Sequence, residues 1–404
     1  MSTRSAPKMG VKRRAPKKAK SPAKPAPLPE DTPRVLHCHS TFAPGGKELR
    51  AVQLMNAFGR KLRHSIVSAV PGQYGAHDYI SKQIKVDYPR KFPALSGLPT
   101  PGRLAKIAKA LKKYDLILTY NWGAMDVVMA HTIFAKNMDL PPLIHHEDGF
   151  NEDEATELKM RRNVYRRVGL RQSHALVVPS KRLEAIGRNV WGQPPERLRR
   201  IPNGIDTERF AKKPNPKALR AIKREGEQWV GTLAGFRPVK QLDELVCAFA
   251  KLPENWQLVL VGEGPERDAI ANVADSLGIS HRVLMPGAVK DPSEVIGLFD
   301  IFALSSASEQ FPLSVVEAMA AGLPVAAPDA GDIRDMVSAE NHDFIAPAGD
   351  TPALGSMLER LAKDADLRAK IGKSNQVKAC EKFDEAAMIE AYRRLYSDAL
   401  GREF

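Results

Sequence analysis

Residues 301–330 of this chain read IFALSSASEQFPLSVVEAMAAGLPVAAPDA. The stretch opens with a short apolar run that ends in serines, and its last seven residues begin with a second apolar run. The residues between them, from Pro312 to Gly322, are predicted to form a helix. Two buried strands joined by a helix lie parallel in one sheet, and helices then cover both faces of that sheet. This stretch therefore predicts an α/β fold.

The same alternation of strands and helices runs along most of the chain. The second half contains three more predicted strands, and the first half contains five, at 228–236, 256–262 and 281–287 and at 34–40, 64–70, 115–120, 141–150 and 174–180. Pro202 and the pair Asn203–Gly204 predict a turn between the two halves. At 404 residues, the chain is also longer than one hydrophobic core usually supports. We therefore expect two doubly wound, Rossmann-like α/β domains that face a cleft.

The net charge of +14 is unevenly distributed along the sequence. Residues 1–33 contain nine basic residues against Glu30 and Asp31, in a segment rich in Lys, Pro and Ala that cannot build a core. A solvated, disordered tail is one interpretation, and attraction to an anionic membrane surface is another. Nucleic-acid binding is not favoured, because no aromatic residue lies between the charges to stack on bases.

Several other classes of protein are disfavoured by what the sequence lacks. No run of about 18 uncharged apolar residues occurs, so no membrane-spanning helix is expected. The basic N-terminus lacks the apolar centre of a secretory signal. The three cysteines, Cys38, Cys247 and Cys380, match neither a disulfide framework nor a zinc-binding spacing. We therefore expect a cytoplasmic protein.

The loop and helix after the strand at 301–306 contain residue types suited to binding a nucleotide diphosphate. The free backbone N–H groups of Leu313 and Ser314, at the predicted helix start, form an anion site. Glu317, one turn further on, can accept hydrogen bonds from two adjacent ribose hydroxyls. Glu309, on the loop, is expected to face a sugar. The helix dipole alone also favours an acid in this turn, so Glu317 has a purely structural alternative.

Four segments together resemble glycosyltransferase family 4. Glu309 and Glu317, with an aromatic residue between them and EAMAAGLPV at 317–325, resemble its Glu-x7-Glu motif. Three further segments resemble family motifs in the family's order: APGGKE (43–48), IPNGIDTERF (201–210) and LAGFRPVKQLDELVCAF (233–249). The resemblance extends from about Arg34 to the C-terminus. It implies the two-domain GT-B architecture, in which the first glutamate contacts the donor sugar and the second holds the nucleotide ribose.

The resemblance and the composition of the tail divide the chain into four parts. These are a disordered basic tail at 1–33, an acceptor-side domain at 34–204, a nucleotide-sugar-binding domain at 205–384 and a C-terminal helix at 385–404. In that last helix Met388, Tyr392, Leu395 and Tyr396 share one face. We expect this face to cross back and pack on the N-terminal domain.

Arg237 and Lys240 follow the first predicted strand of the C-terminal domain. Lone surface cations are usually solvated. The resemblance instead places these two beside the leaving diphosphate, whose charge they would neutralise as a metal ion does in other enzymes. No metal and no other cofactor is therefore expected. The sequence departs from the family at Gln241, where the family has glycine.

Three glycines are further candidates for contact with the donor. Gly45 and Gly46 lack side chains, so the backbone of their loop can approach a ligand; a tight strand-to-helix turn is the alternative. Gly262 lies in GEGPER (262–267), which the family places near the donor. That segment lacks the third glycine of a dinucleotide fingerprint, and a plain turn also explains it.

His146 and Asp148 lie where the family has its active-site histidine, which aligns with Asp148. In a strand, residues two apart point to the same side. Either Asp148 accepts a hydrogen bond from a sugar hydroxyl with His146 supporting it, or His146 substitutes directly. A structural histidine is the alternative. Asp148 is not expected to bind a metal, because no second carboxylate has a suitable spacing.

Together these features predict a retaining, metal-independent glycosyltransferase. It would move a sugar from a nucleotide diphosphate to a glycan or lipid-linked glycan, in polysaccharide or cell-envelope biosynthesis. The resemblance implies a front-face route, in which the leaving phosphate itself takes the acceptor's proton. The alternatives are a sugar-nucleotide epimerase or a phosphorylase of the same fold, and a non-catalytic protein that binds membrane or nucleic acid through its tail.

The N-terminal domain, which faces the acceptor in the family, is predicted to be basic. Five arginines lie within 161–171 and four lysines within 106–113. Basic helices can dock on an anionic bilayer that holds a lipid-linked glycan, which would place the protein at the inner face of a membrane. A solvated helix face is the alternative.

Overall fold

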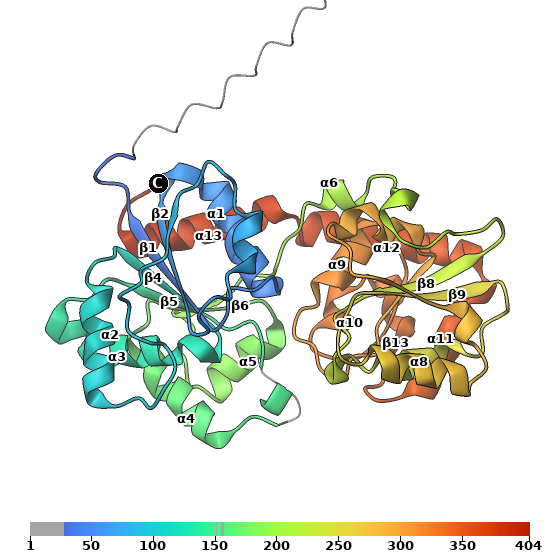
Figure 1. The fold of residues 1–404 in the computed structure, drawn as a ribbon, viewed down its shortest axis with the longest axis horizontal. Coiled ribbons are helices and arrows are strands. Elements are labelled where there is room, and N and C mark those ends of the chain that lie inside the picture. The colour runs from blue at the N-terminus through green and yellow to red at the C-terminus, as the bar shows by residue number, and fades with distance from the viewer. Residues whose placement is uncertain (1–27, 151, 155–156) are drawn as a thin grey trace, which may run out of the picture. The chain divides into compact units, whose positions relative to one another are not determined.

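Two parallel β-sheets organise the computed structural model, which describes residues 28–150, 152–154 and 157–404 (Figure 1). Most of the predicted tail at 1–33 therefore lies outside the described residues. The first sheet has the order β3-β2-β1-β4-β5-β6-β7 and the second has the order β10-β9-β8-β11-β12-β13. Every pairing within them is parallel, which confirms the predicted α/β class.

The strands of both sheets are short. Those of the first sheet are β1 (Arg34–His39), β2 (Arg63–Ser68), β3 (Val86–Asp87), β4 (Leu116–Tyr120), β5 (Leu143–His146), β6 (Ala175–Val178) and β7 (Leu198–Arg200). Those of the second are β8 (Gln228–Leu233), β9 (Trp256–Val261), β10 (Val283–Gly287), β11 (Ile301–Ala303), β12 (Val325–Pro328) and β13 (Ile345–Ala346). The sequence predicts neither β3, β7 nor β13, because two or three residues make no recognisable apolar run.

Helices connect the strands and cover both sheets. In the N-terminal domain they are α1 (Gly46–Phe58), α2 (Pro101–Leu111), α3 (Met125–Met138), α4 (Met160–Gly169) and α5 (Lys181–Asn189). Later in the chain they are α6 (Thr207–Phe210), α7 (Leu242–Phe249), α8 (Arg267–Ser276), α9 (Leu313–Ala320), α10 (Ile333–Met336), α11 (Thr351–Lys363), α12 (Ala365–Lys382) and α13 (Glu385–Leu400). None of the described helices combines the length and the apolar composition that crossing a membrane requires.

The last helix, α13, completes the hydrophobic core of the N-terminal domain. Its residues Met388, Tyr392, Leu395 and Tyr396 are buried in one cluster with α1 and with strands of the first sheet. Figure 1 shows α13 running beside α1, although more than 300 residues separate them in the sequence. An apolar stripe on an otherwise polar helix packs in this way because burial removes it from water.

The chain passes between the two domains twice, and the two passages are hydrogen-bonded to each other. The Ile205 N–H donates to the Phe383 carbonyl (3.0 Å), and the Glu385 N–H donates to the Ile205 carbonyl (2.9 Å). A Cβ on Gly204 would lie 2.9 Å from the Asp384 carbonyl oxygen, so this close approach requires glycine. The turn predicted at Asn203–Gly204 therefore lies where the two passages meet.

Candidate functional site

The loops that follow β8 and β11 are held together at the carboxyl ends of these adjacent strands. Lys240, on the loop after β8, forms an ion pair with Glu309, on the loop after β11. The Ser305 hydroxyl donates to the Lys240 carbonyl (2.9 Å), and the Ala307 N–H donates to the Val239 carbonyl (3.0 Å). The two candidate residues therefore meet because β8 and β11 are neighbours in the sheet.

Gln241, where the sequence departs from the family, keeps the backbone conformation of a glycine. Its φ of 45° and ψ of 48° lie in the left-handed region, directly before α7. A residue with a side chain pays about 1 kcal/mol to adopt this conformation. The chain thus tolerates strain here while keeping the path of the loop that carries Lys240.

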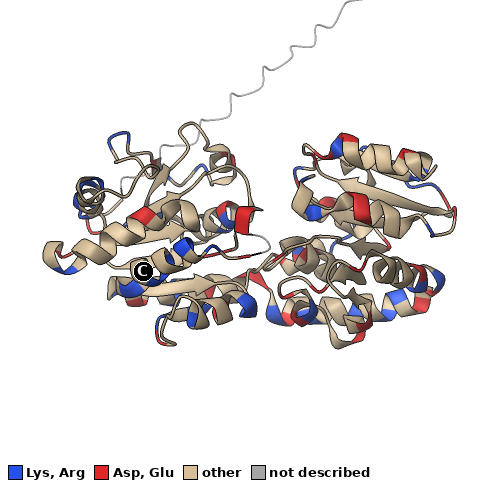
Figure 2. Cartoon of the chain, turned by 90° about the horizontal axis from the view of Figure 1, so that it is seen from below, with Lys and Arg blue, Asp and Glu red and all other residues tan. Residues whose placement is uncertain are grey.

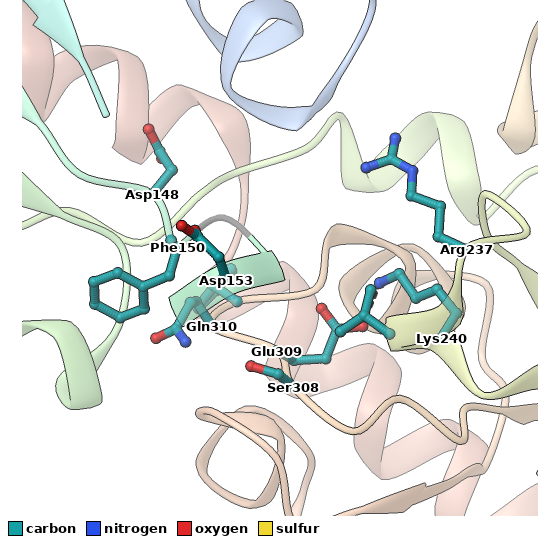
Figure 3. Close-up of a pocket in the computed structure, with 11 residues that line it drawn as sticks. Asp148, Phe150, Asp153, Arg237, Lys240, Ser308, Glu309 and Gln310 are labelled. Carbon is teal, nitrogen blue, oxygen red and sulfur yellow. Dashed lines mark hydrogen bonds and ion pairs between the residues drawn. The ribbon is translucent and has the colours of Figure 1, made fainter. Parts of the chain in front are cut away.

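A cavity of about 700 Å³ brings together four of the predicted catalytic residues (Figure 3). Its lining is Arg237, Val239, Lys240, Ser308, Glu309, Gln310 and Phe311 of the C-terminal domain and Asp148, Gly149, Phe150 and Asp153 of the N-terminal domain. Arg237 is exposed, and its side chain forms no hydrogen bond or ion pair with the residues that the structure describes. The cavity therefore contains one unpaired cation beside the Lys240–Glu309 pair.

Asp148 is paired with Arg50, a residue that the sequence analysis missed. Arg50 Nη2 donates to Asp148 Oδ2 (2.9 Å), and Arg50 Nη1 donates to both Asp148 Oδ1 and Asn203 Oδ1, the latter at 3.0 Å. Burial of the Arg50 side chain lowers its pKa, but the charge and hydrogen bonds of Asp148, together with Tyr392 and Tyr120, raise the pKa overall. Arg50 precedes Leu54 by four residues and Phe58 by eight, so it lies on the apolar face of α1. A charged residue on such a face implies a buried partner of opposite charge.

His146 lies in the core and does not line the cavity. Its ring stacks on Tyr120 with 4.6 Å between centroids, and its Nδ1 lies 3.2 Å from the Thr119 carbonyl oxygen. Burial and the nearby charge of Arg50 hold its pKa well below the usual value, so the ring is neutral. The structure thus brings Asp148 to the cavity and places His146 with the buried rings of the sheet.

Glu317 and Leu313 line a second cavity, of about 910 Å³, which also contains Arg50. The predicted motif is therefore divided, with Glu309 in the first cavity and Glu317 in the second. Burial, with a smaller contribution from Asp291, raises the pKa of Glu317 to about 7. A nucleotide that reached both glutamates would have to pass the start of α9.

The glycines occupy close contacts, as their sequence context predicts. A Cβ on Gly46 would lie 3.9 Å from Leu313 Cδ1, so the first residues of α1 and α9 are neighbours. A Cβ on Gly45 would lie 2.8 Å from Glu48 Oε2. Gly262 has a φ of 154°, and its Cβ would lie 1.8 Å from the Ala234 carbonyl oxygen. Only the approach at Gly262 requires glycine, because its Cβ would overlap backbone atoms. The two cavities are lined by none of Gly45, Gly46, Gly262 and Ser314.

No group of three or more His, Cys, Asp or Glu residues with the geometry of a metal site occurs among the described residues. The carboxylates of the first cavity are instead paired with cations. Glu309 pairs with Lys240, Asp148 with Arg50, and Asp153 with Lys159 and Arg162. The charge of these acids is thus balanced by side chains of the chain itself.

Comparison with protein families gives two matches that cover most of the chain. Residues 44–209 match the model described as Glycosyltransferase Family 4, and residues 217–378 match the model described as Glycosyl transferases group 1. The boundary between the matches falls close to the linker that contains Gly204.

Several curated proteins with similar sequences are named as glycosyltransferases. N-acetyl-alpha-D-glucosaminyl L-malate synthase of Bacillus anthracis is 30% identical over 178 residues, which cover 44% of this chain and 47% of the synthase. D-inositol 3-phosphate glycosyltransferase of Corynebacterium glutamicum is 25% identical over 354 residues, or 81% of each chain. The chain spans about half the length of the synthase and of two lipopolysaccharide core glycosyltransferases of Rhizobium meliloti.

Solved structures share the fold at low sequence identity. HepE of Anabaena in complex with UDP superposes with a TM-score of 0.74 and 21% identity, over 90% of this chain and all of HepE. The complex of HepE with UDP-glucose gives the same TM-score at 20% identity. WaaG, a glycosyltransferase involved in lipopolysaccharide biosynthesis, superposes with a TM-score of 0.64 over 89% of this chain.

Proposed function

This chain belongs to the family 4 glycosyltransferases and has their two-domain GT-B fold, and from that premise we propose that it transfers a sugar from a nucleotide diphosphate with retention of anomeric configuration. Membership of the family and the GT-B fold class confirm two predictions made from the sequence. The donor, the stereochemistry, the independence from metal and the acceptor are the proposal.

One observation carries the proposal: Arg237, which has no described partner, and Lys240 line one cavity with Glu309. Charge that develops on a departing diphosphate is stabilised by cations fixed in advance where that charge appears. Figure 3 shows Arg237 and Lys240 together on one side of the cavity and Asp148 and Phe150 on the other. The sugar would then lie between Glu309 and Asp148, and no metal ion is needed for the charge.

The pairing of the cavity's carboxylates supports a front-face route with retention. A carboxylate that acts as nucleophile or base must be able to give up its other partners. Glu309 and Asp148 are both engaged by cations, and Arg50 holds Asp148 through two nitrogens. The leaving phosphate is then the available base for the acceptor hydroxyl, on the same face as the departing bond.

The nucleotide is proposed to lie along the starts of α1 and α9. Their free backbone N–H groups favour phosphate, and Gly46 and Leu313 bring the two helix starts together. Glu317 would accept hydrogen bonds from the ribose hydroxyls. The complexes of HepE with UDP and UDP-glucose make a uridine diphosphate sugar the first donor to test.

A third cavity, of about 430 Å³, lies on the N-terminal domain and suits an amphiphilic acceptor. Its lining includes Leu95, Met125 and Tyr165. Its one carboxylate, Asp126, already accepts from Arg103 Nη1 (2.5 Å) and from the Tyr165 hydroxyl (2.7 Å). Few polar groups remain for the hydroxyls of a sugar ring, so the lining favours an apolar part of the acceptor.

The edge of the third cavity favours a lipid-linked acceptor that carries an anionic group. Arg161 lines the cavity and has no partner among the described residues. Leu98 and Met160, each adjacent in sequence to lining residues, are 80% and 76% exposed. An apolar rim beside a free cation suits a phosphate-bearing lipid at a bilayer surface.

Two of the arginines of α4 form ion pairs within the N-terminal domain. Arg166 is buried and pairs with Glu147 and Glu154, and Arg162 pairs with Asp153 and Glu154. These two arginines balance internal carboxylates and are not available to a membrane. Figure 2 correspondingly shows basic and acidic residues interspersed along the helices.

Turnover of nucleotide sugars tests the proposed function. Uridine, guanosine and adenosine diphosphate sugars would be screened for thermal stabilisation and for slow hydrolysis, and NMR would assign the anomeric configuration of the released sugar. We expect at least one donor to be hydrolysed in the presence of EDTA, with retention. Inversion, or activity that EDTA abolishes, would contradict the proposal. Release of a sugar 1-phosphate from a glycan supplied with inorganic phosphate would indicate a phosphorylase instead.

Deletion of residues 1–33 separates the enzyme from a tail-driven binding protein. An enzyme keeps its turnover without the tail, whereas a protein that acts through the tail loses its partner. Co-sedimentation with vesicles of anionic or neutral lipid tests the membrane surface. We expect stronger binding to anionic vesicles, and weaker binding when Met160 and Arg161 are replaced by serine.

A further inference from the structure

Asp332 is the N-cap residue of α10, but its side chain makes no hydrogen bond to its own helix. Its two carboxylate oxygens instead accept from the start of α5 in the N-terminal domain. The Lys181 N–H donates to Asp332 Oδ2 (2.5 Å), and the Arg182 N–H donates to Asp332 Oδ1 (3.1 Å). Asp332 is 7% exposed, so this contact is largely shielded from water.

The first turn of α5 depends on Asp332 for two of its four unbonded N–H groups. Ser180, the N-cap residue, accepts from the Leu183 N–H through its hydroxyl (3.1 Å) and from the Glu184 N–H through its carbonyl (3.0 Å). Among the described residues, the backbone N–H groups of Lys181 and Arg182 have only Asp332 as their acceptor. A carboxylate at a helix start gains from both the hydrogen bonds and the helix dipole, so the contact is favourable.

The backbone next to Asp332 supports the loop that carries Glu309. The Asp332 N–H donates to the Gln310 carbonyl (3.2 Å). Gly331 has a φ of 64°, and a Cβ there would lie 2.5 Å from the Glu309 carbonyl oxygen. Residues 331–332 therefore lie against the Glu309 loop while the Asp332 side chain bonds to α5.

The same loop also contacts the N-terminal domain near Asp148. A Cβ on Gly149 would lie 3.2 Å from Gln310 Cγ. Gly149 follows Asp148, and both line the first cavity with Glu309 and Gln310. The width of this cavity between Asp148 and Glu309 thus depends on how firmly residues 331–332 are held to α5.

We propose that Asp332 is a positioning residue: by binding the start of α5 it fixes the Glu309–Gln310 loop relative to Asp148 in the first cavity. Its importance for turnover rests on the proposed transfer reaction, whereas its effect on the distance between the two domains does not. Asp332 itself does not touch substrate. Its contribution is to hold Glu309 where the sugar is expected, since misplacement by about 1 Å can cost on the order of 100-fold in rate.

Two independent substitutions each weaken the contact by removing one of its two hydrogen bonds. Asp332→Asn leaves one oxygen acceptor and presents an amide to the second N–H. Lys181→Pro removes one donor instead, and proline is well tolerated at the first position of a helix. Ser180 already has the extended conformation that proline requires of the residue before it (φ −123°, ψ 154°).

Asp335→Asn is the matched control. Asp335 lies on the same short helix and pairs with the Lys181 side chain (2.9 Å), but both side chains are more than half exposed. Its loss removes an exposed ion pair without affecting the N–H groups of α5. It also controls for the side-chain pair that Lys181→Pro deletes.

The distance between the domains is the first measurement. Spin labels at positions 188 and 363, with Cys247 and Cys380 replaced by serine, report it by double electron–electron resonance. We expect Asp332→Asn and Lys181→Pro to broaden the distance distribution, Asp332→Glu to broaden it less, and Asp335→Asn to leave it unchanged. Unchanged distributions in both test variants, or equal broadening in the control, overturn the proposal.

Steady-state kinetics with the donor found in the screen is the second measurement. We expect kcat to fall on the order of 10-fold in both test variants, while KM for the donor and the melting temperature change little. A fall that tracks a lowered melting temperature and returns on cooling indicates a merely structural role and overturns the positioning role. If no donor is turned over, the proposed function fails, and the distance measurement alone decides whether Asp332 holds the domains.

Discussion

Arg50 binds both carboxylate oxygens of Asp148, although 98 residues separate them, and it lines the cavity of Glu317 while Asp148 lines the cavity of Glu309. The same guanidinium reaches Asn203 in the linker and lies 5.7 Å from the centre of the Tyr392 ring on α13. One side chain thus connects the first helix, the cavity, the linker and the last helix.

Arg50→Met is expected to destabilise the protein by about 3–5 kcal/mol, because it leaves the carboxylate of Asp148 poorly solvated and unpaired. Adding Asp148→Asn should recover part of the loss. Urea unfolding of both single variants and the double variant measures the coupling. The same double-mutant cycle on the exposed pair Arg34–Asp115 is the control, and its coupling free energy should be about 0–1 kcal/mol. Equal coupling in the two cycles would contradict burial as the cause.

Arg237→Ala and Lys240→Ala are each expected to lower turnover by on the order of 100-fold, because each removes a cation facing the leaving diphosphate. Arg224→Ala, at a side chain 83% exposed, is the control and should keep full turnover. The measurement is kcat with saturating donor. Unchanged kcat in both cavity variants would remove these residues from the mechanism.

Nucleotide affinity is expected to weaken as the pH falls through about 7, the value to which burial raises the pKa of Glu317. Only the ionised carboxylate accepts hydrogen bonds from both ribose hydroxyls, and protonation removes one acceptor. The stability of the folded state depends on pH in the opposite direction. The folded state favours the protonated form of Glu317, so the contribution of this residue to folding stability is lost as the pH rises from about 4.5 to 7. Titration with UDP from pH 6 to 8 measures affinity, and Glu317→Gln should flatten the profile. An equally steep profile in that variant would exclude Glu317 as the group.

Arg166→Ala is expected to cost about 3–5 kcal/mol of stability, since it leaves Glu147 as a buried, uncompensated charge and Glu154 with Arg162 as its remaining cation. The neighbouring Arg167 is exposed, and Arg167→Ala should change stability by no more than about 0.5 kcal/mol. Denaturant midpoints of the two variants give the comparison. Similar losses would show that Arg166 is not the centre of a buried network.

Acid is expected to destabilise the N-terminal domain through its buried histidines. Burial lowers the pKa of His64 to about 4 and holds those of His37, His39 and His146 well below the usual value. The unfolded chain binds protons at these residues below about pH 6.5 while the folded state does not, so stability is lost as the pH falls from there. Each histidine contributes up to about 1.4 kcal/mol per pH unit.

Urea unfolding at pH 7.5, 6 and 5 measures this slope. His64→Gln should make the slope shallower, whereas His281→Gln, at an exposed side chain, should leave it unchanged. A slope that neither substitution alters would assign the acid sensitivity to other groups.

Local pattern was enough to predict the fold, and the family resemblance predicted one side of the site. Alternation of apolar runs and helical periods reports which face of each element is buried, and it predicted the parallel sheets and the packing of α13 through Met388 and Tyr392. Arg237, Lys240 and Glu309 were placed at one site by the resemblance to the family, and the structure brings them to one cavity because each follows the carboxyl end of one of two adjacent parallel strands.

The long-range pairing of charged residues could not be predicted from the sequence. The ion pair of Arg50 with Asp148 and the contact of Asp332 with α5 join residues far apart along the chain, and spacing carries no information about such partners. The roles of His146 and Arg166 were equally open, because a polar residue in an apolar run is compatible with both a site and a satisfied core.

The sequence by itself therefore determined the two α/β domains, the family motifs and the cluster of Arg237, Lys240 and Glu309. Only the tertiary structure decided that Glu309 and Glu317 line different cavities, that His146 is buried, and that Arg50 neutralises Asp148. The physical reason is that the spacing of apolar residues, which decides the face of each helix or strand that is buried, is a local property of the sequence. The electrostatic environment of each charge depends instead on which distant elements the completed fold packs against it.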